Sequence, residues 1–501
     1  MRIVDLLERS YLLYKNKLAV FVFDEDEIKY SDLRNRSISL ANSLKLRGIE
    51  KNDRIILLAD NSSVYFYLSF ACSYLGASLV PLNTGLSQIE RDYIISNAEP
   101  ALIVVDKNNK NNIKKVKYNC DVLFTDKSIY SKYLNSNYSE NILYDSRESD
   151  INLIIYTSGT TGKPKGVCLS QKALYYNAMT ACISQNLNHS DKFLSMTPLY
   201  HASAGVRIFT MIIDGQTHYV MNQFDPNKVI EYFYNYKLTT TIAVPNQISR
   251  ILNSKKFDKK MLNSLRLLVY GAAPTNLKLI KKLISYFPNK LCQGYGLTET
   301  VSQLTCLTPN DHILYKNNDQ ILMSVGREIS GVKIEIRNNK GKSIFNEVGE
   351  ICVQTEKIMH GYWQNSKETK KVLDNNWFKT GDLGIKDDNG YIQIVGRSKD
   401  MIISGGVNLY PLEIENTLIE YSCISEAAVI GINSDEWGEI PYAFIKLKGT
   451  EQFDEMSLKM WLEDRLTKYK IPKFYQIINK FPKTRTGKIM KHKLKILINE
   501  S

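Results

Sequence analysis

The feature that most restricts the fold is a regular alternation of helical and strand patterns along the first 400 residues. Residues 54–59 form an apolar run of strand length, and residues 64–75 follow with the pattern of a buried helix. Residues 77–80 then read as a second strand, residues 88–97 as a helix, and residues 101–105 as a third strand. Repeated β-α-β order places strands side by side in parallel, with helices covering them. We therefore predict an α/β fold with helix-covered, mostly parallel sheets.

The chain is long enough for two domains, because one hydrophobic core rarely serves 501 residues. A boundary is indicated near Gly396-Arg397-Ser398-Lys399-Asp400, which is followed by the glycine pair Gly405-Gly406. The last hundred residues contain helices and strands of their own, enough for a small domain. We predict a large domain over residues 1–398 and a small α+β domain over residues 399–501.

The cysteines and the apolar segments bear on where the protein resides. The eight cysteines are scattered without a C-x-x-C pair, which argues against a disulfide framework or zinc site and favours a reducing compartment. The N-terminal residues carry charges that do not suit a signal peptide. Residues 64–82 are apolar but interrupted by Gly76 and Pro81, which favours a buried helix followed by a strand. We predict a cytoplasmic protein with no transmembrane segment.

The formal net charge of the chain is +13, and its lysines are spread along the whole sequence. A basic excess attracts nucleic acid, anionic lipid or polyphosphate ligands. No predicted helix concentrates basic residues between aromatic ones, so we expect a solvated basic surface and no nucleic-acid partner. A salt-dependent DNA shift assay would decide that alternative. Peripheral membrane contact stays open, as do a monomer and a homodimer.

The strongest local signal is a loop rich in small, hydroxyl-bearing and basic residues, Tyr156-Thr157-Ser158-Gly159-Thr160-Thr161-Gly162-Lys163-Pro164-Lys165-Gly166. It follows an apolar strand pattern at residues 151–156 and precedes a helical pattern that begins near Ser170. Backbone N–H groups and hydroxyls at a strand end can bind phosphate oxygens, and lysines add charge. Pro164 and Lys165 stand where a Walker A loop has glycine and lysine. A merely flexible loop is the alternative for this segment taken alone.

The loop resembles the phosphate-binding signature of the acyl-CoA synthetase, nonribosomal adenylation domain and luciferase superfamily of adenylate-forming enzymes. Five further segments resemble motifs of that superfamily in the same order, and together they cover nearly the whole chain. The resemblance implies a large nucleotide- and acyl-binding domain, a small mobile C-terminal domain, Mg²⁺ as cofactor, and ATP and coenzyme A as co-substrates. The five segments are Tyr270-Gly271-Ala272-Ala273-Pro274, Gly294-Tyr295-Gly296-Leu297-Thr298-Glu299-Thr300, Lys379-Thr380-Gly381-Asp382-Leu383, residues 396–411, and Pro482-Lys483-Thr484-Arg485-Thr486-Gly487-Lys488-Ile489.

By resemblance, these segments bind the nucleotide, with Tyr295 closing an adenine slot, Asp382 accepting ribose hydroxyls and Glu299 binding Mg²⁺. The residue types suit those roles: small residues at a strand end admit a flat base, and Mg²⁺ takes few carboxylates beside phosphate oxygens. A packed tyrosine, a turn aspartate and a surface glutamate are the alternatives. The residues implied to bind ATP or AMP are Thr157, Ser158, Gly159, Thr160, Thr161, Gly162, Lys165, Gly271, Ala272, Ala273, Gly294, Tyr295, Gly296, Thr298, Asp382, Arg397 and Lys488.

Lys488 lies in a turn-like segment of a basic tail, where charge alone would predict one more solvated lysine. The resemblance makes it the catalytic lysine, with Thr157 and Glu299 completing the implied catalytic set. A positioned ammonium group would offset the repulsion between a carboxylate and the α-phosphate as they meet. The small domain is implied to rotate about Lys399 between two half-reactions, which brings Gly405-Gly406 to the coenzyme A side.

The acyl site is expected near Met196-Thr197-Pro198-Leu199-Tyr200-His201, which resembles the segment whose histidine borders the acyl group. Relatives that take amino acids place an aspartate nearby, and residues 199–209 contain none, which favours an acid without an amino group. Residues 202–208 are mostly apolar apart from Arg207, so we expect a fatty or aromatic acid and a role such as fatty acid metabolism. A histidine that simply packs in the core is the alternative for His201.

We therefore expect an ATP-dependent acid–thiol ligase. A carboxylate attacks the α-phosphate of Mg·ATP to give an acyl-adenylate and pyrophosphate, and coenzyme A then displaces AMP to give acyl-CoA. A stand-alone enzyme that loads the phosphopantetheine of an acyl carrier protein is the first alternative. A luciferase-like oxygenase shares the motifs without a positive sign for it. A catalytically inactive nucleotide-binding protein would be expected to lack Lys488, Glu299 or Asp382, and all three are present.

Overall fold

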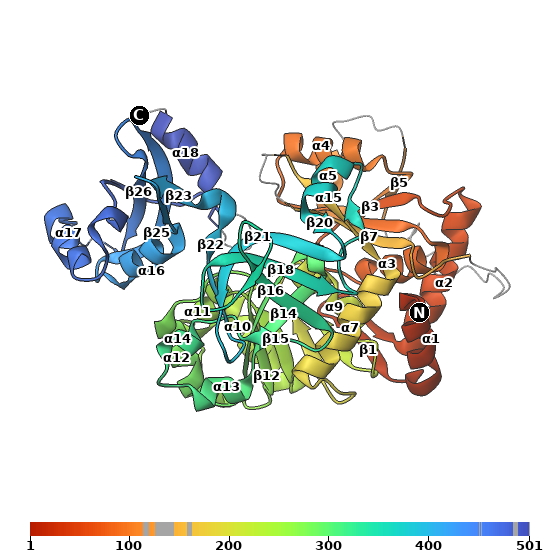
Figure 1. Ribbon diagram of the computed structural model, residues 1–501. Helices are drawn as coiled ribbons and strands as arrows, with labels where there is room; N and C mark the ends of the chain where they lie inside the picture. Colours follow the sequence, from red (N-terminus) through yellow and green to blue (C-terminus); the bar gives the residue numbers. More distant parts are fainter. Residues whose placement is uncertain are drawn as a thin grey trace.

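The computed structural model describes residues 1–113, 120–125, 145–157, 163–449, 451, 453–483 and 489–499. Within these residues, three sheets form a large N-terminal part and a fourth forms a small C-terminal part. Figure 1 shows the small part, in blue, standing beside the large part, with the chain crossing after β22 (Ile392–Arg397). This arrangement confirms the predicted α/β architecture of a large domain and a small C-terminal one.

The central layer of the large part is a nine-stranded sheet whose inner strands are parallel and whose two ends are antiparallel. Alternate residues of one strand enter different cores: Leu267 faces one cluster and Leu268 the other. Helices α10 (Pro226–Tyr236), α11 (Pro245–Leu252) and α12 (Leu277–Tyr286) pack on the second face. In spatial order the strands are β15 (Arg327–Glu328), β14 (Ser302–Leu307), β13 (Leu291–Leu297), β12 (Leu267–Gly271), β11 (Thr240–Ala243), β9 (Lys192–Ser195), β10 (Thr217–Val220), β1 (Leu18–Val22) and β2 (Asp26–Lys29).

A seven-stranded sheet forms the second layer and is parallel except where β8 joins it. Its outer face is covered by α4 (Gln88–Ala98) and α5 (Lys110–Ile113). Between the two layers lie α1 (Ile3–Tyr14), α2 (Tyr30–Leu46), α3 (Val64–Leu75) and α7 (Gln171–Gln185). In spatial order the strands are β19 (Gly361–Tyr362), β8 (Lys165–Ser170), β7 (Ile151–Thr157), β4 (Ser78–Pro81), β3 (Arg54–Leu58), β5 (Leu102–Val105) and β6 (Asp121–Phe124).

Helix α3 is the apolar segment for which the sequence predicts a buried helix, and all twelve of its residues are buried. On one side the Phe66 ring meets the His218 ring of β10 edge-on, with the ring centroids 5.0 Å apart. On another side Asn152 of β7 donates a hydrogen bond to Ser73 Oγ at 2.7 Å. The helix is apolar all round because it contacts both sheets. No helix of the described chain is both long and apolar enough to cross a membrane.

A six-stranded antiparallel sheet over residues 332–397 departs from the parallel alternation predicted for the first 400 residues. Its strand β21 alternates half-buried and buried residues, as expected for a sheet with one face on a core and one toward solvent. That core includes Ile334 and Ile351 of this sheet, and Leu304 of the nine-stranded sheet. The strands are β17 (Ser343–Ile344), β16 (Val332–Arg337), β18 (Gly349–Thr355), β21 (Trp377–Lys386) and β20 (Leu373–Asp374), with β22 paired to β21.

The small part has its own sheet and core. Strands β25 (Ile424–Ser434) and β26 (Gly438–Leu447) form a long antiparallel pair. Helices α16 (Pro411–Glu420) and α17 (Glu455–Glu463) contribute Ile414, Leu418, Leu458 and Leu462 to a core under one face of the sheet, whereas α18 (Lys491–Asn499) places Leu494 in a second cluster. The remaining strands are β23 (Ile402–Ser404), β24 (Val407–Leu409) and β27 (Phe474–Ile477).

Candidate active site

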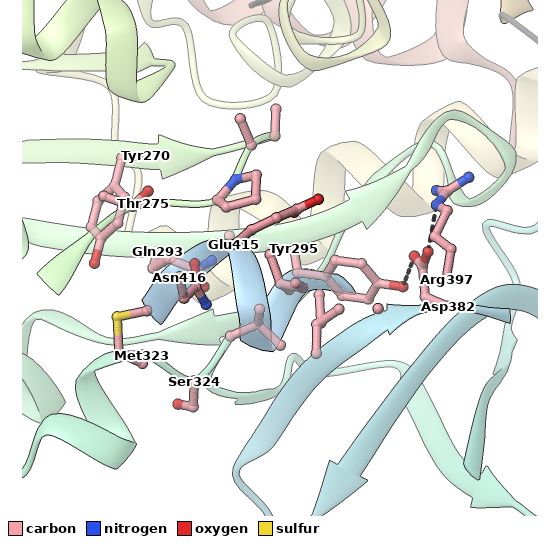
Figure 2. Close-up of a pocket in the computed structure, with 18 of the residues that line it drawn as sticks. Tyr270, Thr275, Gln293, Tyr295, Met323, Ser324, Asp382, Arg397, Glu415 and Asn416 are labelled. Atoms are coloured by element: carbon pink, nitrogen blue, oxygen red, sulfur yellow. Dashed lines mark hydrogen bonds and ion pairs between the residues drawn. The ribbon is translucent and has the colours of Figure 1, made fainter. Parts of the chain in front are cut away.

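A cavity of about 330 Å³ lies between the large and small parts, at the carboxyl ends of β12 and β13 (Figure 2). Open parallel sheets commonly hold ligands at this end, where loops diverge and leave room. From the large part, the segments at residues 272–275 and 293–297 line the cavity, together with Asp382 and Arg397. From the small part, Glu415 of α16 and Lys491 of α18 line it. The cavity therefore brings together four of the six resembling segments, and Lys491, which follows the C-terminal segment in the sequence, also lines it.

The strand ends are kept free of side chains by glycine. Gly271 pairs with Gly294 across β12 and β13, and its φ of 154° is a conformation that other residues rarely adopt. A Cβ atom at Gly271 would lie 2.1 Å from the main-chain oxygen of Gly294, so a larger residue would push the strands apart. The next residue, Ala272, is exposed and has a left-handed φ of 62°. The floor of the cavity is therefore a bare backbone surface that a flat ring can approach.

Asp382 lines this cavity together with Tyr295 and Arg397, at one end of the group of residues in Figure 2. It lies opposite Arg397 on the antiparallel pair β21–β22, and Arg397 Nε lies 2.7 Å from Asp382 Oδ1. The Tyr295 hydroxyl donates a hydrogen bond to Asp382 Oδ2 at 2.8 Å. Burial, followed by the charge of Asp382, raises the pKa of Tyr295, so this hydroxyl keeps its proton. The carboxylate is 7% exposed and still has lone pairs available to further donors.

Thr380 fixes the main chain that carries Asp382. Its hydroxyl donates a hydrogen bond to the main-chain oxygen of Ile351 at 2.8 Å and accepts one from the Asp382 N–H at 3.0 Å. The Gly381 N–H donates to Glu350 Oε1 at 3.1 Å. These contacts tie the turn to β18, so the carboxylate is held in place before any ligand binds.

A second polar group surrounds Glu299, which lies on a short 3₁₀ turn, Thr298–Thr300. The Tyr362 hydroxyl donates a hydrogen bond to Glu299 Oε1 at 3.0 Å, and burial followed by the Glu299 charge raises the pKa of Tyr362. The Lys165 ammonium lies 5.1 Å from the centre of the Tyr362 ring. Lys165 also pairs with Glu368 at 2.5 Å, and hydrogen bonds from Lys165 and Lys371 lower the pKa of Glu368 to about 2. Tyr362 therefore links Glu299 to Lys165.

Tyr362 and Glu368 were not anticipated as parts of the site. Tyr362 is one of 31 tyrosines in the chain, and no spacing marks it as a partner of a glutamate 63 residues away. Glu368 lies in the first turn of α15 (Ser366–Val372), where an acidic residue is ordinary. Both reach the site because β19 pairs with β8, a long-range contact that the pattern of either segment does not contain.

Magnesium requires only a few protein ligands when phosphate oxygens supply the others. Among the residues that the structure describes, no cluster of three or more His, Cys, Asp or Glu side chains could hold a metal ion by itself. Glu299 is a single half-buried carboxylate whose side chain is oriented by Tyr362. Its chemistry therefore fits a magnesium ion delivered with a nucleotide and does not fit a permanently bound transition metal.

A second, smaller cavity of about 200 Å³ adjoins the first. Gly294, Tyr295, Gly296 and Leu297 line both cavities, so the two share one wall. The second cavity is also lined by Gly271, Ala272 and Thr298 and, from elsewhere in the chain, by His201, Arg207, Ile242, Val244 and Val269. His201 precedes α8 (Ala202–Gly205) and packs its ring against Tyr200, with the ring centroids 4.7 Å apart.

The remaining predicted site residues lie elsewhere or outside the described chain. Thr157 ends β7 and pairs with Lys165 of β8. Lys399 is exposed on a 3₁₀ turn, Ser398–Asp400, and Gly405-Gly406 form the exposed turn between β23 and β24. Residues 158–162 of the loop and Lys488 lie outside the described residues. Lys491, three positions after Lys488 in the sequence, lines the first cavity and pairs with Glu415 at 2.5 Å.

Comparison with protein families gives two matches on this chain. Residues 7–363 match the AMP-binding enzyme family, and residues 413–488 match the AMP-binding enzyme C-terminal domain. The chain is 32% identical over 487 residues to 2-succinylbenzoate–CoA ligase of Oceanobacillus iheyensis, which covers 96% of this chain and 97% of that protein. It is also 31% identical over 468 residues to feruloyl-CoA synthase of Amycolatopsis sp, a match that covers 93% of this chain and 92% of that protein.

Solved structures resemble the whole chain. ATP-bound MatB from Rhodopseudomonas palustris has a TM-score of 0.90 at 28% identity, covering 100% of this chain and 99% of that one. o-Succinylbenzoate CoA synthetase from Bacillus subtilis in complex with its acyl-adenylate intermediate has a TM-score of 0.86 at 27% identity. This match covers 98% of this chain and 97% of that one. The fold, the cavity at the strand ends and these matches agree with the resemblance found in the sequence motifs. The chain therefore belongs to the AMP-binding enzyme family and is an ATP-dependent, AMP-forming acid–thiol ligase.

Proposed function

We propose that the chain converts an aromatic carboxylic acid to its coenzyme A thioester in two steps at the two adjoining cavities. The acid carboxylate attacks the α-phosphate of Mg·ATP, which forms the acyl-adenylate and releases pyrophosphate. The coenzyme A thiolate then attacks the acyl carbon, which forms the thioester and releases AMP. The observation that carries this proposal is the wall at residues 294–297 shared by both cavities, because an acid in one cavity would lie beside a nucleotide in the other.

The first cavity is the proposed nucleotide site. The adenine would lie between the bare strand end at residues 271–273 and the Tyr295 ring, a flat slot that suits a base. Asp382 would accept hydrogen bonds from the two ribose hydroxyls, and Arg397, which pairs with it, would contact the ribose or the phosphates. Gly294 and Gly296 would leave room for the nucleotide, and Thr298, on the wall of the second cavity, would lie beside the α-phosphate.

The phosphates are proposed to bind at the end of β7. Thr157 and the loop Ser158, Gly159, Thr160, Thr161 and Gly162 would bind the β- and γ-phosphates through main-chain N–H groups and hydroxyls. Lys165 would add positive charge, shared with its partner Glu368. Glu299 would hold the magnesium ion that neutralises part of the phosphate charge.

The small domain, taken as residues 399–501, is proposed to supply Lys488 to the adenylation step. Lys491 of the same tail already lines the nucleotide cavity, which supports this assignment. For the second step the small domain would turn about Lys399 and bring Gly405-Gly406 toward the thiol. Both glycines have positive φ values, 56° and 80°, and are exposed, so they can form a tight turn at a surface.

The acid is proposed to be aromatic. Ile242, Val244 and Val269 give the second cavity apolar walls, and His201 borders it. A cavity of about 200 Å³ suits a compact ring better than a long acyl chain. The relatives named above act on succinylbenzoate and on a feruloyl group, both of which contain a benzene ring. These observations favour the aromatic half of the fatty-or-aromatic expectation.

A pyrophosphate-release screen tests the function. We expect release only when ATP, Mg²⁺ and a suitable aromatic acid are present, with thioester formation when free coenzyme A is added. The screen should pair aromatic acids with short, medium and long fatty acids, each with coenzyme A or a phosphopantetheine-bearing carrier protein. Thioester formed only on the carrier would replace coenzyme A as the acceptor. Absence of release with every acid would contradict the proposed reaction.

Tyr362→Phe tests the magnesium site. Without the hydroxyl, Glu299 loses a hydrogen bond that orients its carboxylate, so we expect about a tenfold increase in the Mg²⁺ concentration needed for half-maximal pyrophosphate release. The KM for the acid should stay unchanged. Tyr176→Phe, in an exposed tyrosine, serves as the control. An unaltered magnesium dependence in Tyr362→Phe would remove Glu299 as the ligand.

A further inference from the structure

The second cavity contains a basic side chain that the proposed reaction does not use. Arg207 begins α9 (Arg207–Thr210), is only 5% exposed and lines this cavity but not the nucleotide cavity. Its guanidinium lies over the Phe193 ring, 5.7 Å from the ring centre. The charge is therefore set among apolar and aromatic groups, beside Ile242, Val244 and Val269 of the cavity wall.

A buried guanidinium is costly unless an anion or several acceptors compensate it. Within the described part of the chain, Arg207 has no hydrogen bond and no ion pair to a carboxylate. Burial is the larger effect and lowers the pKa of Arg207 to about 10. The titratable groups that act in the opposite direction are the thiols of Cys182 and Cys292. Burial raises the pKa of the Cys182 thiol to about 12, so that thiol is neutral and provides no counter-charge.

A second basic group lies close by, and none of the described acidic side chains pairs with it. Lys357 is fully buried, donates to the main-chain oxygen of Gln303 and lies 3.4 Å from Asn177 Oδ1. Gln303 lines the same cavity as Arg207. Burial, followed by the charge of Arg207, lowers the pKa of Lys357 to about 7. Arg207 and Lys357 therefore repel each other, and an anion bound in the cavity would reduce this repulsion.

His218, which interacts with Arg207, adds no charge to this region. Burial, followed by the charge of Arg207, lowers the pKa of His218 to about 3, so its ring is neutral at physiological pH. The titratable groups that interact with Arg207 are thus a lysine, a neutral histidine and two thiols, and none of them is a carboxylate. The described surroundings of the guanidinium carry a net positive charge.

Building on the proposed function, we infer that Arg207 binds a second carboxylate on the acid, so that the substrate is an aromatic diacid. The carboxylate to be activated lies at the wall shared with the nucleotide cavity, and the ring lies against the apolar residues. The second carboxylate then reaches Arg207, which can bind both of its oxygens through two parallel N–H donors. An acid with one carboxylate leaves the guanidinium without a partner, so the site discriminates against it.

Matched acids test this assignment with the full chain. 2-Succinylbenzoate and 3-benzoylpropanoate share the same skeleton and differ only in the carboxylate on the ring. We expect the wild-type kcat/KM for pyrophosphate release to favour the diacid by about tenfold to a hundredfold. Phthalate and benzoate provide a second pair with a shorter skeleton. Equal rates for both members of each pair would overturn the diacid inference while leaving the proposed ligase function in place, whereas no release with any acid would remove both.

Substitution of Arg207 separates recognition from structure. Arg207→Met keeps the side-chain volume and removes the charge, so we expect the rate for the diacid to fall by about tenfold to a hundredfold and that for the monoacid to hold or rise. Arg207→Lys should recover part of the diacid preference. Removal of an uncompensated buried charge should also keep or raise the melting temperature.

Arg250→Met is the matched control, because Arg250 is exposed, lies over the Phe224 ring at 4.8 Å and is outside this cavity. It should leave the diacid preference unchanged. If Arg207→Met lowers the rates for both acids equally, or keeps the wild-type preference, Arg207 is a packing residue and the inference is wrong.

Discussion

Replacement of Lys488 with alanine is expected to abolish acyl-adenylate formation while sparing thioester formation from supplied acyl-AMP. The first step brings a carboxylate to the α-phosphate, and a positioned ammonium group stabilises the charge that develops between them. Loss of one such group commonly lowers the rate by about a hundredfold or more. The second step joins a thiolate to an uncharged acyl carbon, and there the small domain is proposed to have turned away. The two steps should therefore respond differently to one substitution.

Two assays separate these steps. ATP–pyrophosphate exchange reports adenylation, and AMP release from purified acyl-AMP with coenzyme A reports thioester formation. Lys495→Ala is the matched control, because Lys495 is exposed on α18 of the same basic tail. Exchange at the wild-type rate in Lys488→Ala would show that another group provides the charge. Lys491, which lines the nucleotide cavity, would then be the next residue to test.

Much of the fold follows from local pattern, and α3 shows why. Its twelve mostly apolar residues are too few and too interrupted downstream for a membrane span, and the structure buries every one of them between two sheets. The continuous apolar runs of the parallel strands were equally informative, because a strand that contributes side chains to two cores is buried on both faces. The antiparallel sheet over residues 332–397 was not anticipated, although its strand β21 alternates half-buried and buried residues, because the pattern of one strand does not say which strand it pairs with. Pairing partners at that distance leave little trace in either strand alone.

The residues of the candidate site likewise fall into those that local sequence identifies and those that only the fold brings together. Segments proposed to hold the nucleotide could be identified because their chemistry is local: glycines at a strand end, an aspartate in a turn. Partners brought by tertiary structure could not be predicted. Tyr362 reaches Glu299 only through the pairing of β19 with β8, and Lys357 reaches the wall of the second cavity from a loop after β18. Arg207 stood out in the sequence as a charge in an apolar run, but that no acidic partner reaches it among the described residues is a property of the fold alone.

Asp382→Ala is expected to lower kcat/KM for ATP by about a hundredfold or more. In wild type the carboxylate would accept both ribose hydroxyls, and hydrogen bonds to a charged group contribute about 1.5–3 kcal/mol each. A loss of about 1.4 kcal/mol corresponds to a tenfold change, so two such bonds account for the predicted effect. The substitution also leaves Arg397 without its partner at 2.7 Å and the Tyr295 hydroxyl without its acceptor at 2.8 Å. Both walls of the proposed slot would therefore loosen.

2′-Deoxy-ATP identifies the cause of that loss. Wild-type enzyme should prefer ATP over 2′-deoxy-ATP by about tenfold, and Asp382→Ala should use both equally, because the acceptor of the missing hydroxyl is gone. Asp388→Ala is the control, since this acid is exposed on the same β21–β22 hairpin and bonds only the Asn346 side chain among its described contacts. If Asp382→Ala retains the wild-type preference for ATP, the carboxylate holds Tyr295 and Arg397 in place without touching the ribose. The nucleotide would then have to lie differently in the cavity.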